Sequence, residues 1–494
     1  MTVEKVAATA AADDECVECG YEPELKRTLG SFQIFAISFA FISVAVGIFA
    51  TFDDVLLTAG PVGIWLWIIV AVGQTLVALV VAQFAARIAL SGSSYQWASR
   101  LANPKIGWLF GWLTFWYLAT SVVALDNALA SQAFMPLVGL QESEDTARLL
   151  TVAIMIAQAV LIILSTRLLG LFTSMAVGLE LAIVVVLVLG LGAVMVFTGS
   201  GDIGNLTSRG ITAADSNYFA IGGGLMAATI MGLTTLVGFD SAANLAEEAK
   251  DPFRSVPRAI VASVVAAGVL GLLFLIALTV AIKDVPGVTA SGSPVASIIR
   301  SQLGPVAERI LLAGIAIAMF GAGMVVIAAC SRQVFAMARD KRFPAHVLMR
   351  RVNPRTQTPL PATILILVVG VVLMVALPGA ALMQLIIGGT ILPALIYGAV
   401  MILYLAVRKR LEHREGGFSL GRFELPVAIA ALIWVVAALV FLVTPGDATI
   451  PTLVVLGLIL AGGVYFAYMM IFNREVLDTE PGDDIFAAPA EMAE

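Results

Sequence analysis

The stretch TTLVGFDSAANLAEEAKDPFRSVPRAI, residues 234–260, decides the fold of this chain. An apolar run ends there in a Gly–Phe–Asp step at Gly238, Phe239 and Asp240, a cluster of charges follows, and a second apolar run begins. An interrupted helix leaves backbone N–H and C=O groups that cannot pair within it. The stretch therefore predicts either a membrane helix broken near Gly238 or a glycine at a tight crossing of two helices.

The composition places the chain in a membrane. Of its 494 residues, 60% are hydrophobic and only 13% are charged, and the mean hydropathy is +0.99. A soluble protein carries about 25% charged residues. The chain is therefore expected to be an all-α polytopic membrane protein with lipid as its solvent.

Twelve apolar runs are long enough to cross a bilayer, which takes about 20 residues per helix. Backbone groups cannot stay unpaired in lipid, so each run must be a helix, and the third, fifth and sixth are long enough to tilt, bend or break. The runs are 31–53, 61–86, 106–137, 149–166, 170–198, 219–247, 256–282, 305–331, 360–377, 381–407, 425–443 and 450–472.

The basic residues set the expected topology. With the N-terminus inside the cell, all but five of the 28 lysines and arginines lie on the cytoplasmic side; the five are Arg148, Arg209, Lys283, Arg300 and Arg309. Cytoplasmic loops carry such an excess. We expect a plasma (inner) membrane protein with both termini cytoplasmic. The N-terminal tail shows no signal peptide, and its Cys16 and Cys19 are read as two reduced thiols because a zinc site needs two more ligands.

A weak internal repeat is visible. The first run carries SVAVGIFATFDD, residues 43–54, and the sixth carries the quoted stretch; each has a glycine (Gly47, Gly238) with a phenylalanine and an aspartate nearby. This pattern is typical of inverted repeats with discontinuous helices around a site at mid-membrane. The expected division is a tail at 1–30, repeats at 31–200 and 201–408, two further helices at 409–473, and an acidic tail at 474–494.

Three acids fall inside apolar runs: Asp126, Glu180 and Asp240. An ionised group there is costly, so such a residue usually lines a cavity or pathway. Asp126 is expected either to bond to a neighbouring helix or to lie on a proton pathway. Asp240 is expected to cap a half-helix, to contact the ligand, or both. Glu180 has no intramembrane base to pair with, which makes it a candidate proton carrier.

Broken helices suggest how a small zwitterion would bind. The N-terminus of a half-helix attracts a carboxylate and the C-terminus of another attracts a cation. Two facing breaks would hold both ends of an amino acid with hardly any side-chain charge.

Three motifs resemble the amino acid–polyamine–organocation permeases. They are the quoted stretch with its Glu247, Glu248, Lys250, Asp251, Pro252, Arg254 and Pro257; ACSRQVFAMARDKRFP from Ala329 to Pro344; and SGSSYQWASRLANPKIGWLFGW from Ser91 to Trp112. The likeness runs over most of the chain. The sequence is most similar to the branch that handles amino acids, GABA and choline. The stretch from Gly170 to Glu180 also resembles that branch.

The resemblance implies a five-plus-five inverted repeat with two extra helices, and a substrate between the first, third, sixth, eighth and tenth helices. By position, the substrate-binding breaks fall on Ser43, Val44, Ala45, Val46 and Gly47 and on Val237, Gly238, Phe239 and Asp240. Thr234 stands where some relatives have a gating aromatic residue. Glu247, Glu248, Lys250, Arg254, Arg332 and Arg339 are expected to form an inner gate, or else to be solvated charges that hold the topology.

Two helices lack the residues that relatives use for coupling, which weakens both the usual proton assignment and the usual sodium assignment. Many proton-driven relatives have a lysine on the fifth helix, but residues 170–199 contain none. Sodium-driven relatives use hydroxyls on the eighth helix, but residues 311–329 contain no serine or threonine. Glu180 is therefore our candidate for carrying the proton.

The predicted function is secondary active import of an amino acid or small amine, with protons, by alternating access. The alternatives are an organocation, polyamine or choline transporter, an exchanger, or an ion channel, although no filter motif is visible. The sequence shows no H-E-x-x-H motif, nucleophile elbow or large catalytic loop, so an enzyme is not expected. Expected partners are the small solute, lipid and protons, with no cofactor, metal or nucleic acid.

Overall fold

The computed structural model describes residues 25, 27–140, 143–164, 166–291, 293–354, 356, 358–376, 381–411, 417–444 and 448–478. Cys16 and Cys19, and all of the acidic tail beyond residue 478, lie outside these residues. Within them every regular element is a helix, and the only β-type pairing is an isolated bridge between Leu29 and Ala249. The predicted all-α polytopic fold is confirmed.

Ten of the described helices are long and apolar enough to cross a membrane, and two shorter apolar helices, Gly224–Thr235 and Leu360–Ala376, complete the expected set. The segments are α2 (Ser31–Ile42) with α3 (Val44–Thr58); η1 (Pro61–Trp65) with α4 (Leu66–Ala85); α6 (Pro104–Ala128) with the π-helix η2 (Leu129–Phe134) and α7 (Met135–Val138); α8 (Glu144–Leu164); α9 (Thr166–Thr198); α10 (Gly224–Ala227) with α11 (Thr229–Thr235) and α12 (Ser241–Asn244); α13 (Pro252–Val280); α16 (Pro305–Arg339); α18 (Leu360–Ala376); α19 (Ala381–Val407); α20 (Glu424–Val443); and α21 (Thr449–Phe472).

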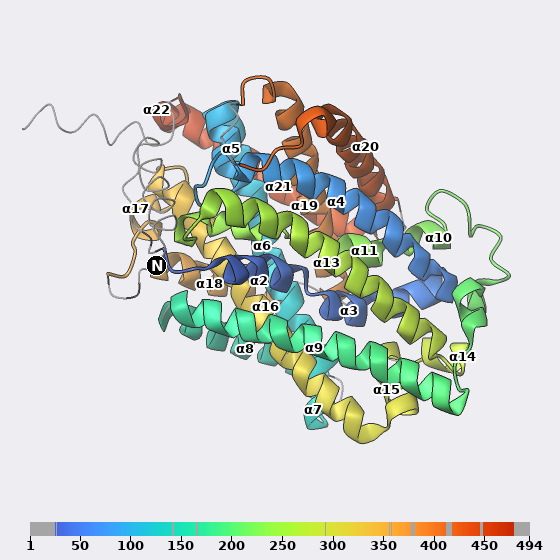
Figure 1. Cartoon of the computed structure of the whole chain (residues 1–494). Coiled ribbons are helices and arrows are strands. Elements are labelled where there is room, and N and C mark those ends of the chain that lie inside the picture. The colour runs from blue at the N-terminus through green and yellow to red at the C-terminus, as the bar shows by residue number, and fades with distance from the viewer. Residues whose placement is uncertain are drawn as a thin grey trace, which may run out of the picture.

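Shorter helices lie between the spans. They are α5 (Ser94–Leu101), η3 (Ile203–Thr207), η4 (Gly210–Thr212), η5 (Ala246–Glu248), α14 (Val285–Thr289), α15 (Pro294–Leu303), α17 (His346–Met349), η6 (Gly421–Phe423) and α22 (Arg474–Asp478). The N-terminal end, α17 and α22 lie at one end of the bundle, and α10, α14 and α15 at the other (Figure 1). An even number of crossings produces this arrangement.

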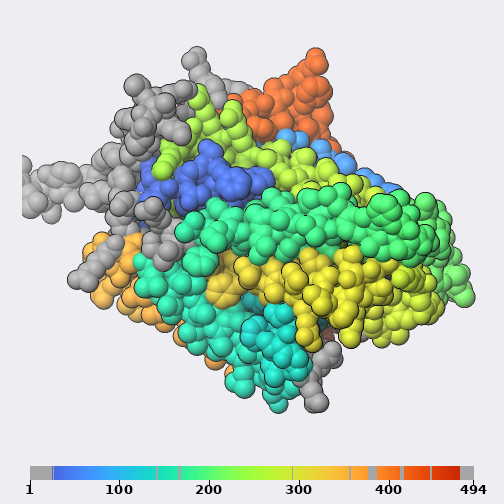
Figure 2. Space-filling view, turned by 60° about the horizontal axis from the view of Figure 1, so that its bottom comes forward, coloured from blue at the N-terminus to red at the C-terminus, as the bar shows by residue number. Residues whose placement is uncertain are grey.

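The first span lies inside the bundle. In Figure 1, α2 and α3 follow one another through the middle of the molecule, with α13 on one side and α9 on the other. Figure 2 shows α9 between the N-terminal segment and the yellow segment of α15 and α16. Outward-facing positions of the peripheral helices carry exposed apolar side chains, such as Leu149, Val375, Leu460 and Val464, as expected for a surface in contact with lipid.

Candidate substrate site

The first span is broken at one residue, Ser43. Its φ of 40° and ψ of 75° place it in the left-handed region between α2 and α3. The Ser43 N–H donates to the Phe39 carbonyl (2.9 Å) and ends α2, and the Gly47 N–H donates to the Ser43 carbonyl (3.0 Å) and begins α3. The first three N–H groups of α3 have no partner inside the helix. The break thus turns donors toward the centre of the protein.

Gly47 lies just past this break, inside the first turn of α3, and it serves a tight crossing. A Cβ atom on Gly47 would lie 2.1 Å from Oγ1 and 2.7 Å from Cβ of Thr235. No side chain larger than hydrogen fits there without movement of α3 or α11. Of the two alternatives for the paired glycines, Gly47 therefore matches the close crossing.

The sixth span is broken from Leu236 to Asp240, between α11 and α12. Gly238 has a φ of +77°, a conformation that only glycine adopts without strain. Its N–H donates to the Tyr397 hydroxyl (3.1 Å). The Ser38 hydroxyl of α2 donates to the Phe239 carbonyl (2.7 Å), which joins the first span to the sixth at the break.

Asp240 lies behind this break. It occupies the N-cap position of α12, but its side chain makes no capping hydrogen bond. Its Oδ1 accepts from the Tyr397 hydroxyl at 2.8 Å, and the Tyr397 ring stacks on Phe239 with centroids 4.9 Å apart. In this conformation Asp240 holds α19 against the sixth span.

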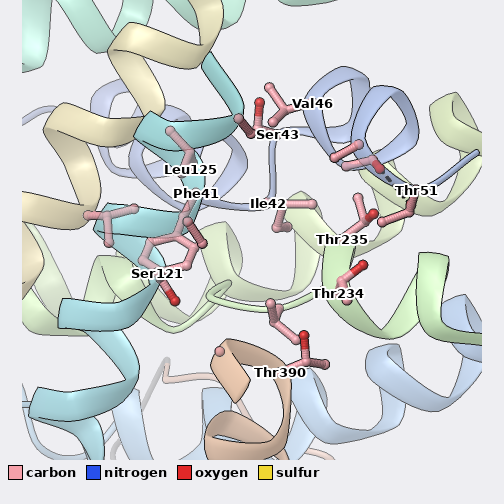
Figure 3. Close-up of a pocket in the computed structure, with 17 residues that line it drawn as sticks. Phe41, Ile42, Ser43, Val46, Thr51, Ser121, Leu125, Thr234, Thr235 and Thr390 are labelled. Atoms are coloured by element: carbon pink, nitrogen blue, oxygen red, sulfur yellow. Dashed lines mark hydrogen bonds between the residues drawn. The ribbon is translucent and has the colours of Figure 1, made fainter. Parts of the chain in front are cut away.

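A cavity of about 110 Å³ lies between the two breaks (Figure 3). It is lined from α3, α6, α11, α16 and α19 and from the residues next to the breaks, which are the five spans that the resemblance implies. The lining residues are Phe41, Ile42, Ser43, Val46, Gly47, Ala50, Thr51, Ser121, Ala124, Leu125, Ala128, Thr234, Thr235, Val237, Val326, Gly389 and Thr390, none of which is charged. Ser43, Val46, Gly47, Thr234 and Val237 were predicted site residues. Val44, Ala45, Gly238, Phe239 and Asp240 are near it but do not line it.

Three hydroxyls of the cavity wall are already used as donors by their own helices. Thr51 donates to the Gly47 carbonyl (2.7 Å), Thr234 to the Ile230 carbonyl (2.9 Å) and Thr235 to the Met231 carbonyl (2.6 Å). Each hydroxyl has one proton, so what remains for a solute is its lone pairs. These groups suit a donor such as an ammonium ion.

Glu180 reaches the break of the first span from α9. Its Oε1 accepts the Ala45 N–H at 3.0 Å and the Ser43 hydroxyl at 3.3 Å, and its side chain is buried. Because Ser43 lines the cavity and Glu180 does not, the carboxyl group lies one residue behind the cavity wall. It acts as a cap for α3 that comes from another span.

Asp126 is on α6, next to residues of the cavity wall, but faces away from it. Its Oδ1 accepts from the Gln158 side-chain amide of α8 at 2.8 Å, and the same amide donates to the Phe320 carbonyl at 3.1 Å. This geometry matches the alternative of a bond to a neighbouring helix.

The family can now be stated from comparison with known proteins. The model of the amino acid permease family matches residues 29–464. The chain belongs to this family. The permease is 26% identical over 466 residues to "Amino-acid permease BAT1 homolog" of Oryza sativa subsp. japonica, covering 87% of this chain and 86% of the relative.

Two further relatives have names with narrower substrates. The "GABA-specific permease" of Saccharomyces cerevisiae is 27% identical over 371 residues, covering 72% of this permease and 64% of the relative. The "Putative polyamine transporter" of Candida albicans is 25% identical over 449 residues, covering 86% and 79%. The predicted resemblance is confirmed, and the permease is a multi-pass membrane transporter of small molecules, not an enzyme.

Two buried ion pairs close the end of the permease that was predicted to be cytoplasmic. Arg332 Nε bonds to Glu248 Oε1 at 2.7 Å, with both side chains almost fully buried, and Arg339 bonds to Glu247 Oε1 at 3.1 Å. Glu247 also accepts the Ser91 N–H (2.9 Å). Four of the six predicted inner-gate residues are therefore brought together.

The other two inner-gate residues lie beside these pairs. The Lys250 backbone N–H donates to the Leu29 carbonyl at 3.0 Å, next to the Leu29–Ala249 bridge. Arg254 lines a separate hollow at the start of α13 with Arg258 and Asp251. These contacts attach the segment before α2 to the end of the sixth span.

Sequence reasoning did not single out Ser121 and Thr390, which bring hydroxyls to the cavity from α6 and α19. Each is a polar residue in an apolar run, and Thr390 follows Gly388 and Gly389. That signal was present, but many serines and threonines in the permease have it, and only the rotation of each helix shows which of them face the cavity.

Proposed function

We propose that the permease imports an amino acid or a small amine together with protons, by alternating access, with the solute held between the breaks of the first and sixth spans. It works in the plasma membrane with both termini in the cytoplasm. The observation that carries the proposal is the placement of one uncharged cavity between the N-terminus of α3 and the C-terminus of α11.

The two helix ends give this cavity its polarity. The first turn of a helix carries about +0.5 elementary charge and the last turn about −0.5. A carboxylate is therefore favoured at α3, and an ammonium group at α11, where the hydroxyls of Thr234 and Thr235 offer lone pairs. The names of the relatives agree, because an amino acid and GABA have both groups and a polyamine has the ammonium group.

The inner gate supports alternating access. In this conformation two ion pairs, Arg332–Glu248 and Arg339–Glu247, close the side of the protein expected to be cytoplasmic. The cavity is lined by α3 and α11, which are the halves of the broken spans on the opposite side. Release of the solute to the cytoplasm requires these pairs to separate. Lys250 and Arg254 lie two and six residues after Glu248, and we expect this segment to move when the pairs separate.

Proton coupling is assigned to Glu180. It is a buried carboxyl group in direct contact with the break, through Ala45 and Ser43, so a change in its charge acts on the solute-binding end of α3. Asp126, whose bonded partner is Gln158, is the second candidate for a proton pathway.

Uptake of labelled amino acids and amines into proteoliposomes tests the proposal. We expect saturable uptake that a pH step drives. The Glu180→Gln variant should lose uptake driven by the pH step but keep counterflow exchange, which needs no net proton movement. Proton-driven uptake that is unchanged in this variant would refute the role of Glu180, and a current that rises linearly with solute would favour a channel.

A further inference from the structure

Two of the donors at the start of α3 are already occupied. The Ala45 N–H and the Ser43 hydroxyl, here called the donor pair, both bond to Oε1 of Glu180. Each has a single proton to donate. A solute carboxylate that binds through the donor pair therefore has to take these donors away from Glu180.

Ser43 is where the competition takes place. Its hydroxyl oxygen belongs to a residue of the cavity wall, while its proton points to a carboxyl group behind that wall. Rotation about the Ser43 side chain would turn the proton from Glu180 to a solute. Ser43 cannot serve both acceptors at once.

No cation among the described residues of the cavity wall can hold two carboxylates together. None of the cavity-lining residues is charged. On α16, Gly314 lies beside Ile183 and Gly321 beside Ala176, so Glu180 is level with the apolar stretch between these glycines.

The elements packed against α9 carry few charged or titratable residues. α2 has none. The titratable and charged residues of the others are Asp53 and Asp54 on α3; Glu144, Asp145 and Arg148 on α8; Arg167 on α9; Arg254 and Arg258 on α13; Arg300 on α15; and Glu308, Arg309, Cys330, Arg332 and Arg339 on α16.

The helix end alone provides too little charge for two anions. About +0.5 elementary charge at the start of α3 would face two full negative charges if Glu180 and the solute were both ionised. A proton on Glu180 removes one of them. It also weakens the hold of Glu180 on the donor pair, because a neutral acid is a poorer acceptor than a carboxylate.

We infer that Glu180 and the carboxylate of the solute compete for the donor pair, so that each solute carboxylate that binds brings one proton onto Glu180. The proton comes from the solution on the side to which the cavity is open, forms an O–H bond on Glu180, and leaves with the solute on the other side. The solute class is an α- or ω-amino acid with a free carboxylate. This inference rests on the proposed function and explains its proton coupling.

Solutes without a carboxylate behave differently under this mechanism. An amine or an amino acid ester leaves the donor pair with Glu180, so its binding takes up no proton. The acid and its ester thus form a matched pair in which only the competition changes.

Binding measured at several pH values tests the inference. The probes are L-alanine, L-leucine, L-ornithine and γ-aminobutyrate, each with its methyl ester, added to the purified full-length permease. Over the pH range in which free Glu180 is ionised, the Kd of an acid should rise about tenfold for each pH unit. The Kd of its ester should stay constant at the pH values where the amino group of the ester remains protonated. Glu180→Gln should abolish the slope for the acid and bind it at high pH more tightly than wild type. Glu308→Gln, at the end of α16, should keep the wild-type slope.

The outcomes separate the inference from the function on which it rests. If no probe binds or is taken up, the proposed function fails. If acids bind but show the same slope as their esters, or keep their slope in Glu180→Gln, the competition is wrong while the transporter stands. If Glu180→Gln does not fold, calorimetry of the wild type in buffers of different ionisation enthalpy decides: one proton bound per acid and none per ester is expected, and equal numbers would overturn the inference.

Discussion

Replacement of Gly238 by alanine tests the break of the sixth span. A Cβ atom at this position would lie 1.8 Å from Cδ1 and 2.1 Å from Cε1 of the Phe41 ring. The backbone also has a φ of +77°. The substitution therefore has two separate costs, one conformational and one steric.

The size of each cost follows from the geometry. A left-handed conformation costs a residue with a Cβ about 1–2 kcal/mol. A methyl group forced into a packed interior costs about 1–3 kcal/mol. The Tyr117 ring lies 5.9 Å away on α6 and blocks one direction, so the Phe41 ring can withdraw only toward the cavity that it lines. Gly238→Ala should lower the free energy of unfolding by about 2–5 kcal/mol.

Unfolding of the detergent-solubilised permease measures this loss. Gly178→Ala is the control, because Gly178 is inside α9 with no atom near its Cβ position; it should be neutral or stabilising by up to about 1 kcal/mol. In a Phe41→Ala background the steric cost disappears and only the conformational cost of about 1–2 kcal/mol remains.

Two results would contradict this reasoning. Wild-type stability of Gly238→Ala would show that the sixth span does not have this left-handed break. An undiminished loss in the Phe41→Ala background would show that the first and sixth spans do not meet at Phe41 and Gly238.

Substitutions at three further contacts are tested by the same unfolding measurement. Arg332→Ala should lower the free energy of unfolding by about 3–5 kcal/mol, because it leaves the Glu248 carboxylate buried without its partner. Glu248→Gln in that background should restore part of the loss. A loss below about 1 kcal/mol for Arg332→Ala would argue against a buried pair. Asp126→Asn should change stability by less than about 1 kcal/mol, since the amide oxygen still accepts a hydrogen bond from Gln158. Asp126→Leu should cost about 1–3 kcal/mol or more, because it removes the acceptor. Equal effects of the two substitutions would rule out this bond. Tyr397→Phe keeps the ring but removes the hydroxyl that joins α19 to the sixth-span break. It should cost about 1–3 kcal/mol for each group left unpaired, the Gly238 N–H and the Asp240 carboxyl. Wild-type stability of this variant would mean that the hydroxyl makes neither bond.

Some of the molecule was predictable because its causes are local. Lipid forces every apolar run of sufficient length into a helix, so the number and order of the spans follow from composition along the chain. Gly238 next to Phe239 and Asp240 indicated a special position in the sixth span, but the sequence left two alternatives, a break or a tight crossing; the φ of +77° at Gly238 decides for the break.

The roles of Gly47 and Asp240 depended on contacts that no local pattern contains. Gly47 was grouped with Gly238 because their neighbours are alike, yet one packs against Thr235 and the other has a positive φ. Asp240 was expected to cap α12 or reach the solute, and its side chain instead bonds to Tyr397, which is 157 residues away.

What the sequence determined by itself is the membrane class, the helical spans and the acids within the membrane; a break at Gly238 was one of two alternatives that it offered. Only the tertiary structure decided that Ser121 and Thr390 face the cavity and that Glu180 reaches the donor pair at Ala45 and Ser43. The physical reason is that hydropathy specifies that a helix crosses the bilayer but not its rotation about its own axis. That rotation is set by packing against neighbouring helices, and here it places the carboxyl group of one span at the open end of another.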